Sequence, residues 1–337
     1  MVRQNRGLAI AHAPRTMPPS PDQKESAVAP SDKIGSAGGR GSAETGMALM
    51  AAAMLLVPGL DAIAKSLTST LAPAQIAWGR FLFQTLAILP VLWLSGRVIR
   101  TRRPLLHAAR GLLLAGALLL IIWAFQYLPL ANAIAIFFVE PLILTLLSAA
   151  FLGERIGPRR LAAVAVGMIG ALIVIRPNWE IFGWAAVLPL GAAVCFAGYL
   201  ALTRHSGDAE HPLAMQLWAG AAATLGLTMV IGLGDGTGIG PIDPVWPAPD
   251  EWALLVGLGA FSATTHVMLA FAFRFAEAGI LAPFQYLEII SATLLGLMFF
   301  GDFPDAMTWA GTALIVAAGL YVFVNERGQP PESRPAS

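Results

Sequence analysis

The sequence predicts an all-α membrane protein with ten transmembrane helices arranged as two inverted five-helix repeats. Three observations predict this class. Of the 337 residues, 57% are hydrophobic and only 12% are charged, whereas soluble globular proteins carry about 25% charged residues. Apolar segments long enough to cross a bilayer recur along nearly the whole chain, and the two halves of the chain align with each other. A soluble globular fold is therefore excluded.

Ten apolar segments have the length of a membrane-spanning helix, which needs about 20 residues. None shows the two-residue alternation of membrane barrel strands, so we predict helices. The segments cover approximately residues 47–68, 73–95, 108–127, 130–151, 158–175, 181–203, 212–233, 252–274, 279–300 and 306–324. We divide the chain into a disordered cytoplasmic tail (1–45), a first repeat (46–178), a second repeat (179–325) and a cytoplasmic C-terminal tail (326–337).

The repeat is visible as matching residues at a fixed spacing. Glu140 and Glu288 each lie inside an apolar segment, and the spacing between them is 288 − 140 = 148 residues. At the same spacing Phe125 aligns with Phe273, Thr145 with Thr293, and Gly153 with Gly301. The second half therefore repeats the first.

Arginines indicate the orientation of the chain, because cytoplasmic loops are enriched in Lys and Arg. Alternate loops hold ten of them: Arg97, Arg100, Arg102, Arg103, Arg110, Arg155, Arg159, Arg160, Arg204 and Arg274. The opposite loops hold Arg176 and several acidic residues. We therefore expect both termini in the cytoplasm. Five helices per half then place the second repeat upside down relative to the first, as in many secondary transporters.

The sequence lacks the motifs that are typical of several function classes. The glycine-rich segment 234–251 has no Gly-Lys-Ser/Thr ending, so it is not a phosphate-binding loop. No nucleophile–base pair or metal-ligand spacing is present, and a single cysteine, Cys195, excludes an intramolecular disulfide. The sequence thus predicts neither an enzyme nor an ATP-driven pump. We expect no metal, cofactor or nucleic-acid partner.

The two glutamates are the main candidates for function. At a rise of 1.5 Å per residue, Glu140 is about 16 Å and Glu288 about 14 Å into its helix, near the middle of a hydrocarbon core about 30 Å thick. Ionisable residues at that depth are costly and usually functional. They could exchange a proton or bind a cationic substrate. The alternative is a structural glutamate that is hydrogen-bonded to a neighbouring helix.

Asp61 and Arg80 lie at similar depth on consecutive predicted helices. Asp61 is also four residues from Lys65, a spacing that suits an ion pair, while an Asp61–Arg80 pair would neutralise both groups. A structural ion pair and a substrate contact are equally good interpretations. Arg80 could instead bind a carboxylate or phosphate through two hydrogen bonds.

Three further residues complete the predicted substrate- or proton-binding set. His266 is alone in its helix, where a hydrogen-bonded interior role is commoner than a proton relay. Gln285 is three residues from Glu288 and shares its helical face, and Tyr199 could stack on a flat substrate. Small residues at four-residue spacing, Ala163-Gly167-Ala171 and Ala313-Ala317, indicate close helix contacts within a scaffold or a homodimer.

Short motifs resemble the EamA branch of the drug/metabolite transporter superfamily. The segment Pro73-Ala-Gln-Ile-Ala-Trp-Gly-Arg80 resembles the start of its second helix. Leu128-Pro-Leu-Ala-Asn-Ala and Phe151-Leu-Gly-Glu154 resemble its third and fourth helices, and the segments 282–288 and 300–304 resemble the second copy. The resemblance covers residues 46–325. It implies two inverted five-helix repeats, a central cavity lined by the first four helices of each half, and transport of metabolites such as amino acids, their derivatives or cofactors.

We therefore predict a secondary active transporter in a bacterial-type inner membrane. It would export or import a small polar metabolite by alternating access around a midplane cavity, coupled to protons or by exchange. The alternative is a membrane scaffold or sensor protein without transport activity, although both tails are too short or too polar to form a sensor domain.

Overall fold

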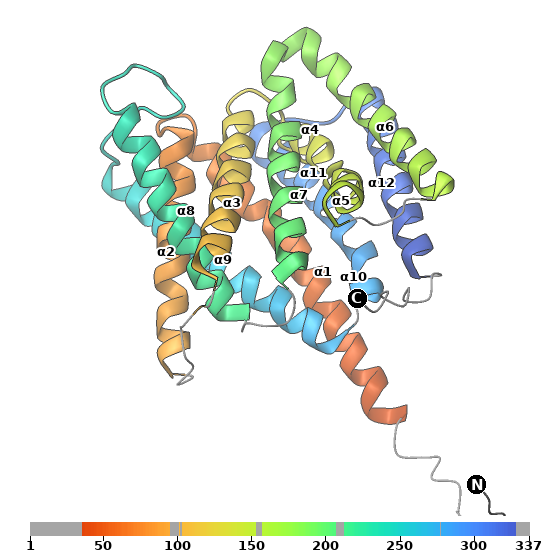
Figure 1. Cartoon of the computed structure of the whole chain (residues 1–337). Helices are drawn as coiled ribbons and strands as arrows, with labels where there is room; N and C mark the ends of the chain where they lie inside the picture. The colour runs from red at the N-terminus through yellow and green to blue at the C-terminus, as the bar shows by residue number, and fades with distance from the viewer. Residues whose placement is uncertain are drawn as a thin grey trace, which may run out of the picture.

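The computed structural model describes residues 36–94, 101, 103–152, 157–206, 212–276 and 278–327 (Figure 1). Within these ranges every regular element is a helix. Residues 1–35, the C-terminal residues 328–337, the loop arginines 97, 100, 102 and 155, and Glu154 lie outside the described residues. The predictions that involve them therefore stay predictions.

The described part of the first half contains six α-helices. They are α1 (Ser36–Leu67), α2 (Pro73–Leu94), α3 (Pro104–Phe125), α4 (Leu130–Phe137), α5 (Glu140–Leu152) and α6 (Pro158–Phe182). The described part of the second half contains two 3₁₀-helices, η1 (Gly183–Val187) and η3 (Ala282–Tyr286), and six α-helices. The latter are α7 (Leu188–Ser206), α8 (Pro212–Gly234), α9 (Pro249–Phe275), α10 (Ala278–Leu281), α11 (Leu287–Phe300) and α12 (Ala306–Arg327).

Prolines mark where many of these helices begin. α2, α3, α6, α8 and α9 each start at a proline. Proline suits this position because its φ angle is already helical and the first helical N–H has no intrahelical acceptor. α1 begins at Ser36, before the boundary expected at residue 46, and α6 continues beyond residue 175. Extending an existing helix adds one hydrogen bond for each residue ordered.

Seven stretches of the described residues are long and apolar enough to cross a membrane. They are Ala43–Leu67, Pro104–Phe125, Leu130–Ala150, Gly183–Thr203, Ala214–Gly234, Pro249–Phe275 and Pro283–Phe300. Leu161–Ile175 and Ala306–Val322 are shorter apolar helices. The chain is therefore a multi-pass helical membrane protein, while the total of ten spans stays a prediction.

Two of the expected helices are broken. The predicted helix 130–151 is interrupted at Phe138 and Val139, between α4 and α5. Pro141 explains the break, because proline has no N–H and its ring clashes with the carbonyl four residues earlier, here that of Phe137, where α4 ends. The predicted helix 279–300 is likewise divided into α10, η3 and α11, with Pro283 at the start of η3. The expectation of continuous helices at both places was wrong.

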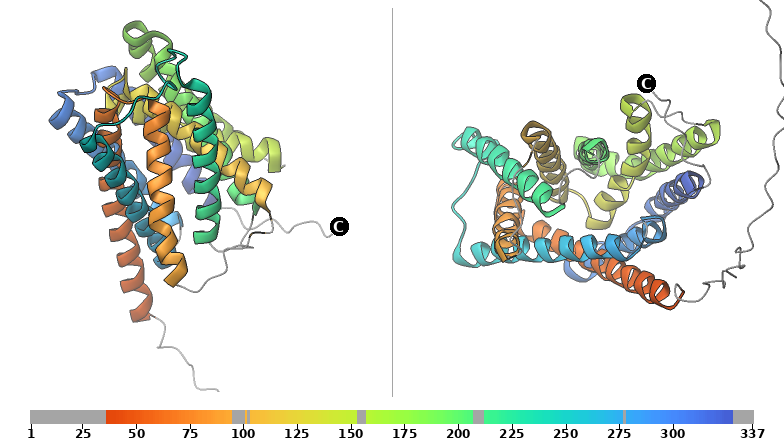
Figure 2. Two further views of the ribbon diagram at one scale, coloured as in Figure 1. Left: turned by 90° about the vertical axis from the view of Figure 1, so that its left-hand side faces the viewer. Right: turned by 60° about the horizontal axis from the view of Figure 1, so that its bottom comes forward.

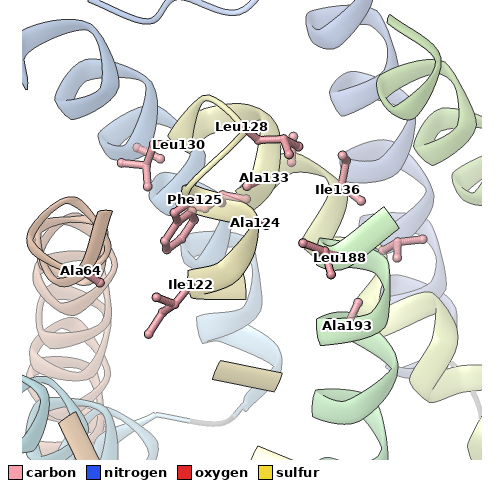
Figure 3. Close-up of a cluster of buried hydrophobic side chains, with 14 of the residues drawn as sticks. Ala64, Ile122, Ala124, Phe125, Leu128, Leu130, Ala133, Ile136, Leu188 and Ala193 are labelled. Atoms are coloured by element: carbon pink, nitrogen blue, oxygen red, sulfur yellow. The ribbon is translucent and has the colours of Figure 1, made fainter. Parts of the chain in front are cut away.

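Helices of the two halves pack against each other throughout the bundle. α3 packs on α7 and α8, α2 on α8 and α9, and α1 on α9 and α11. α6 and α12 form a pair on one side of the molecule, opposite α2, α8 and α9 (Figures 1 and 2). Figure 3 shows apolar side chains of the largest buried cluster, which includes Phe125, Leu128, Ile136 and Leu188.

Glycines form the contact between α6 and α12, and this contact lies within a single chain. A Cβ atom added to Gly170 would lie 2.8 Å from the carbonyl oxygen of Gly311, so the two backbones approach directly. Gly167 belongs to the predicted stripe and is buried here against Ala318. Ala313 and Ala317 are exposed, so they take no part in the α6–α12 contact within this chain, and their alternative role in a homodimer stays a prediction. The buried positions are Gly311, Ile315 and Ala318, which follow the true helical period of about 3.6 residues.

Candidate functional site

An ion pair joins α1 to α2 within the bundle. Nη1 of Arg80 lies 3.7 Å from Oδ1 of Asp61, and the two side chains are only 12% and 11% exposed. Lys65 does not pair with Asp61. Its Nζ lies 2.8 Å from Oδ2 of Asp302 and also donates to the carbonyl oxygen of Leu128. The expected Asp61–Arg80 pair is therefore present, and the four-residue spacing of Asp61 and Lys65 has no such role.

A hydrogen-bonded chain extends from Arg80 to α9. Nε of Arg80 donates to the hydroxyl of Ser262 at 3.2 Å, and that hydroxyl donates to Oε1 of Gln84 at 2.7 Å. Nδ1 of His266 donates to the carbonyl oxygen of Ser262 at 2.8 Å. This bond fixes the tautomer of the neutral imidazole, so Nε2 is the nitrogen left to accept a proton.

Glu288 completes this group from the first turn of α11. Its carboxyl group interacts electrostatically with both Asp61 and Arg80. We refer to Asp61, Arg80, Gln84, Ser262, His266 and Glu288 together as the central polar cluster. It combines two carboxyl groups, one guanidinium and one imidazole drawn from α1, α2, α9 and α11.

Glu140 occupies a similar place on the other broken helix. It is the first residue of α5, directly after the break, while Glu288 is the second residue of α11, which follows η3. Glu140 interacts electrostatically with Tyr286, whose ring packs against Phe138 with centroids 5.5 Å apart. The two helix breaks are therefore in contact with each other. Each glutamate is placed beside irregular backbone rather than within a continuous helix.

Tyr199 is separate from the acidic residues. It lies on α7, where its ring faces the guanidinium of Arg110 at 5.2 Å. Arg110 was counted among the loop arginines, but it belongs to the second turn of α3 and is 3% exposed. Gln285 lies in η3 and joins none of the hydrogen bonds described for the central polar cluster.

The structure thus brings four of the seven predicted residues into one cluster: Asp61, Arg80, His266 and Glu288. Ser262, which connects Arg80 to Gln84 and His266, was missed by sequence reasoning. Its position four residues before His266 was the available signal, because that spacing places both on one helical face. Among the described residues, no group of three His, Cys, Asp or Glu side chains is arranged to hold a metal ion.

The two halves of the chain each match one known family. The sequence model of the EamA-like transporter family matches residues 44–176 and again residues 183–324. The chain belongs to the EamA-like transporter family. It is therefore a membrane transporter and not an enzyme.

Curated proteins with similar sequences are named as transporters of different metabolites. A riboflavin transporter of Rhizobium johnstonii is 31% identical over 283 residues, which cover 82% of this chain and 89% of that protein. An S-adenosylmethionine uptake transporter of Rickettsia felis is 28% identical over 271 residues, covering 79% and 88%. A pseudopaline exporter of Pseudomonas aeruginosa is 29% identical over 287 residues, covering 85% and 98%.

A solved crystal structure has a similar fold. It superposes with a TM-score of 0.58 at 19% identity and covers 86% of this chain and 99% of the other. At that identity the likeness shows the fold alone.

Proposed function

We propose that this EamA-like transporter is a secondary active transporter that moves a small polar metabolite across a bacterial inner membrane, coupled to protons or by exchange. In this proposal ten helices form two inverted five-helix repeats, both termini face the cytoplasm, and access alternates around the membrane midplane. The observation that carries the proposal is the central polar cluster, in which Asp61 forms an ion pair with Arg80 and Glu288 interacts electrostatically with the same arginine.

The balance of charge in the cluster supports proton or cation exchange. If both carboxyl groups are ionised, Arg80 neutralises only one of them. An uncompensated charge inside the bundle costs several kcal/mol by estimates for buried ions. A proton on Glu288, or a cationic group of the substrate, removes that cost. A cluster that needs one movable positive charge is suited to coupling transport to a proton gradient.

The broken helices support alternating access. In secondary transporters, substrate and coupling-ion sites commonly lie at discontinuous helices near the midplane. Here both glutamates follow such a discontinuity, and the two breaks meet through Phe138 and Tyr286. Because the backbone is irregular at both breaks, small rotations there change the position of a glutamate without disturbing long helices.

The names of the relatives support the substrate class. Riboflavin, S-adenosylmethionine and pseudopaline transporters share a small polar metabolite as cargo. Both uptake and export occur among these names, so the likeness fits an importer and an exporter equally. We therefore propose the class of substrate and leave the direction to be measured.

Flux measurements in proteoliposomes test this function. A thermal-shift screen of purified protein, starting with riboflavin and S-adenosylmethionine, first selects a metabolite that binds. Its accumulation is then followed with and without an imposed pH gradient. We expect Glu288→Gln to abolish gradient-driven accumulation and to retain exchange of labelled for unlabelled solute, because exchange needs no net proton movement. We expect a weaker effect for Glu140→Gln, since Glu140 lies outside the central polar cluster.

A matched control is Glu251→Gln, an identical change at a carboxyl group that caps the exposed start of α9. It should accumulate solute like the wild type. Normal gradient-driven accumulation by both Glu140→Gln and Glu288→Gln would exclude proton coupling. Binding without any flux would instead favour the scaffold or sensor alternative.

A further inference from the structure

We propose that Arg110 forms a second solute-binding site, at which the transporter binds the anionic group of its substrate. Arg110 is held rigidly between α3 and α7. Its Nε donates to the hydroxyl of Thr203 at 2.9 Å, its Nη1 lies 3.1 Å from Nδ1 of His107, and its guanidinium faces the ring of Tyr199. The inference rests on the proposed transport function and names the substrate class.

Arg110 differs from Arg80 in its charge balance. Arg80 has Asp61 beside it, whereas among the described residues no carboxylate lies within salt-bridge distance of Arg110. A guanidinium stays protonated under all physiological conditions. A buried, hydrogen-bonded but unneutralised cation in an apolar bundle is expensive, which makes an anion a favourable partner.

The geometry suits a carboxylate or a phosphate. Thr203 and His107 occupy Nε and Nη1, while Nη2 donates no hydrogen bond within the described part of the chain. Thr203 is itself fixed by donating to the carbonyl oxygen of Tyr199 at 2.7 Å. The guanidinium is thus preorganised, and its remaining N–H groups can donate to oxygens of a bound anion.

A row of aromatic rings leads from Arg110 toward the broken fourth helix. Tyr199 contacts Phe196 with centroids 5.6 Å apart, and Phe196 contacts Phe137 at 5.5 Å. Phe137 is the last residue of α4, next to the break that precedes Glu140. We infer a solute with an acidic group at Arg110 and an aromatic or apolar body that lies along these rings.

The Arg110 site is distinct from the central polar cluster. Arg110 is six residues after the start of α3, about 9 Å along the helix, and Arg80 is seven residues after the start of α2, about 10 Å along. Because α2 and α3 follow each other in the chain and begin at opposite faces of the membrane, the two arginines lie at different depths. The solute would therefore meet Arg110 and the acidic cluster at separate points of its route.

Ligand-induced stabilisation tests the site without any gradient. Phenyl phosphate and phenylacetate serve as anionic probes in purified protein at low salt, and benzyl alcohol is the neutral probe. We expect both anions, and not the alcohol, to raise the melting temperature of the wild type. Arg110→Gln should raise the apparent Kd of the anions at least about tenfold, a change that corresponds to about 1.4 kcal/mol. Arg159→Gln, at the exposed start of α6, is the matched control and should bind like the wild type.

Further variants keep the test decisive if Arg110→Gln does not fold. Arg110→Lys retains the charge without the planar fork and should bind the anions more weakly than the wild type, and Thr203→Val should do the same by releasing Nε. The inference would be overturned if each of the three probes raised the melting temperature of Arg110→Lys as much as that of the wild type. It would also be overturned if the wild type bound no anion until Asp208 and Glu210, which lie between α7 and α8 in the sequence, were changed to Asn and Gln. Anion binding with no transport would contradict the proposed function alone.

Discussion

Replacing Arg80 with glutamine should be the most destabilising single change in the central polar cluster. At 3.7 Å, attraction between the Arg80 and Asp61 charges is about 4.5 kcal/mol for an effective dielectric constant of about 20. Removing one partner of a buried pair typically costs about 3–5 kcal/mol, because the other charge stays buried without compensation. We expect Arg80→Gln to cost about that much. Asp61→Asn should cost less, because Arg80 keeps Ser262 and Glu288 as partners.

A double-mutant cycle measures this interaction. The two single variants and the double variant Asp61→Asn/Arg80→Gln are unfolded in mixed micelles with increasing SDS, and unfolding is followed by tryptophan fluorescence. The double variant should cost less than the sum of the single variants by about 2 kcal/mol, within the usual range for interacting residues. Glu251→Gln with Arg159→Gln, a pair at distant helix starts, should be additive. If the Asp61 and Arg80 effects also added to within about 0.5 kcal/mol, the ion pair would contribute nothing and the reasoning would be refuted.

Three further predictions use the same unfolding measurement. Lys65→Met should cost about 1–2 kcal/mol, because it removes a partly exposed ion pair with Asp302 and a hydrogen bond to a backbone carbonyl; no loss would mean that the contact is not energetically significant. Gly170→Ala should lower the free energy of unfolding by about 1–3 kcal/mol, because the added methyl group would clash with α12. Gly232→Ala, whose methyl group would meet open space, should raise it by up to about 1 kcal/mol. If both variants changed the stability in the same direction, the close packing of α6 on α12 would be contradicted. Gly301→Ala should cost about 1–2 kcal/mol because Gly301 ends α11 at φ +71°, and Gly301→Asn should cost less.

The sequence was sufficient for the fold class because its signals are strong and local. Apolar segments of membrane-spanning length and the 148-residue spacing of Glu140 and Glu288 indicated a duplicated helical membrane protein, which the family match confirms. The helix breaks were harder to predict. Pro141 and Pro283 were visible, but proline is tolerated inside membrane helices when neighbouring groups satisfy the backbone, so a continuous helix was a reasonable expectation.

Side-chain partners were predicted less well than helices. The Asp61–Arg80 pair followed from depth alone, because two opposite charges at one level of an apolar bundle attract each other strongly. An ion pair between Lys65 and Asp61 was predicted because their four-residue spacing can be recognised in the sequence. The actual partner of Lys65, Asp302, lies in the other half of the chain. Arg110 was counted with the loop arginines although the predicted helix already began at residue 108, and in the structure α3 begins earlier still, at Pro104.

The contact between α6 and α12 constrains how the two halves can move. It joins the last helix of each half at Gly170 and Gly311, where the backbones approach so closely that a Cβ atom on either glycine would meet the carbonyl oxygen of the other. Two surfaces that touch at backbone level can pivot about their line of contact but can separate only by losing close packing along its length. If the halves rock during a transport cycle, this line is the natural axis. The largest displacements would then fall on the far side of the bundle, at α2, α8 and α9.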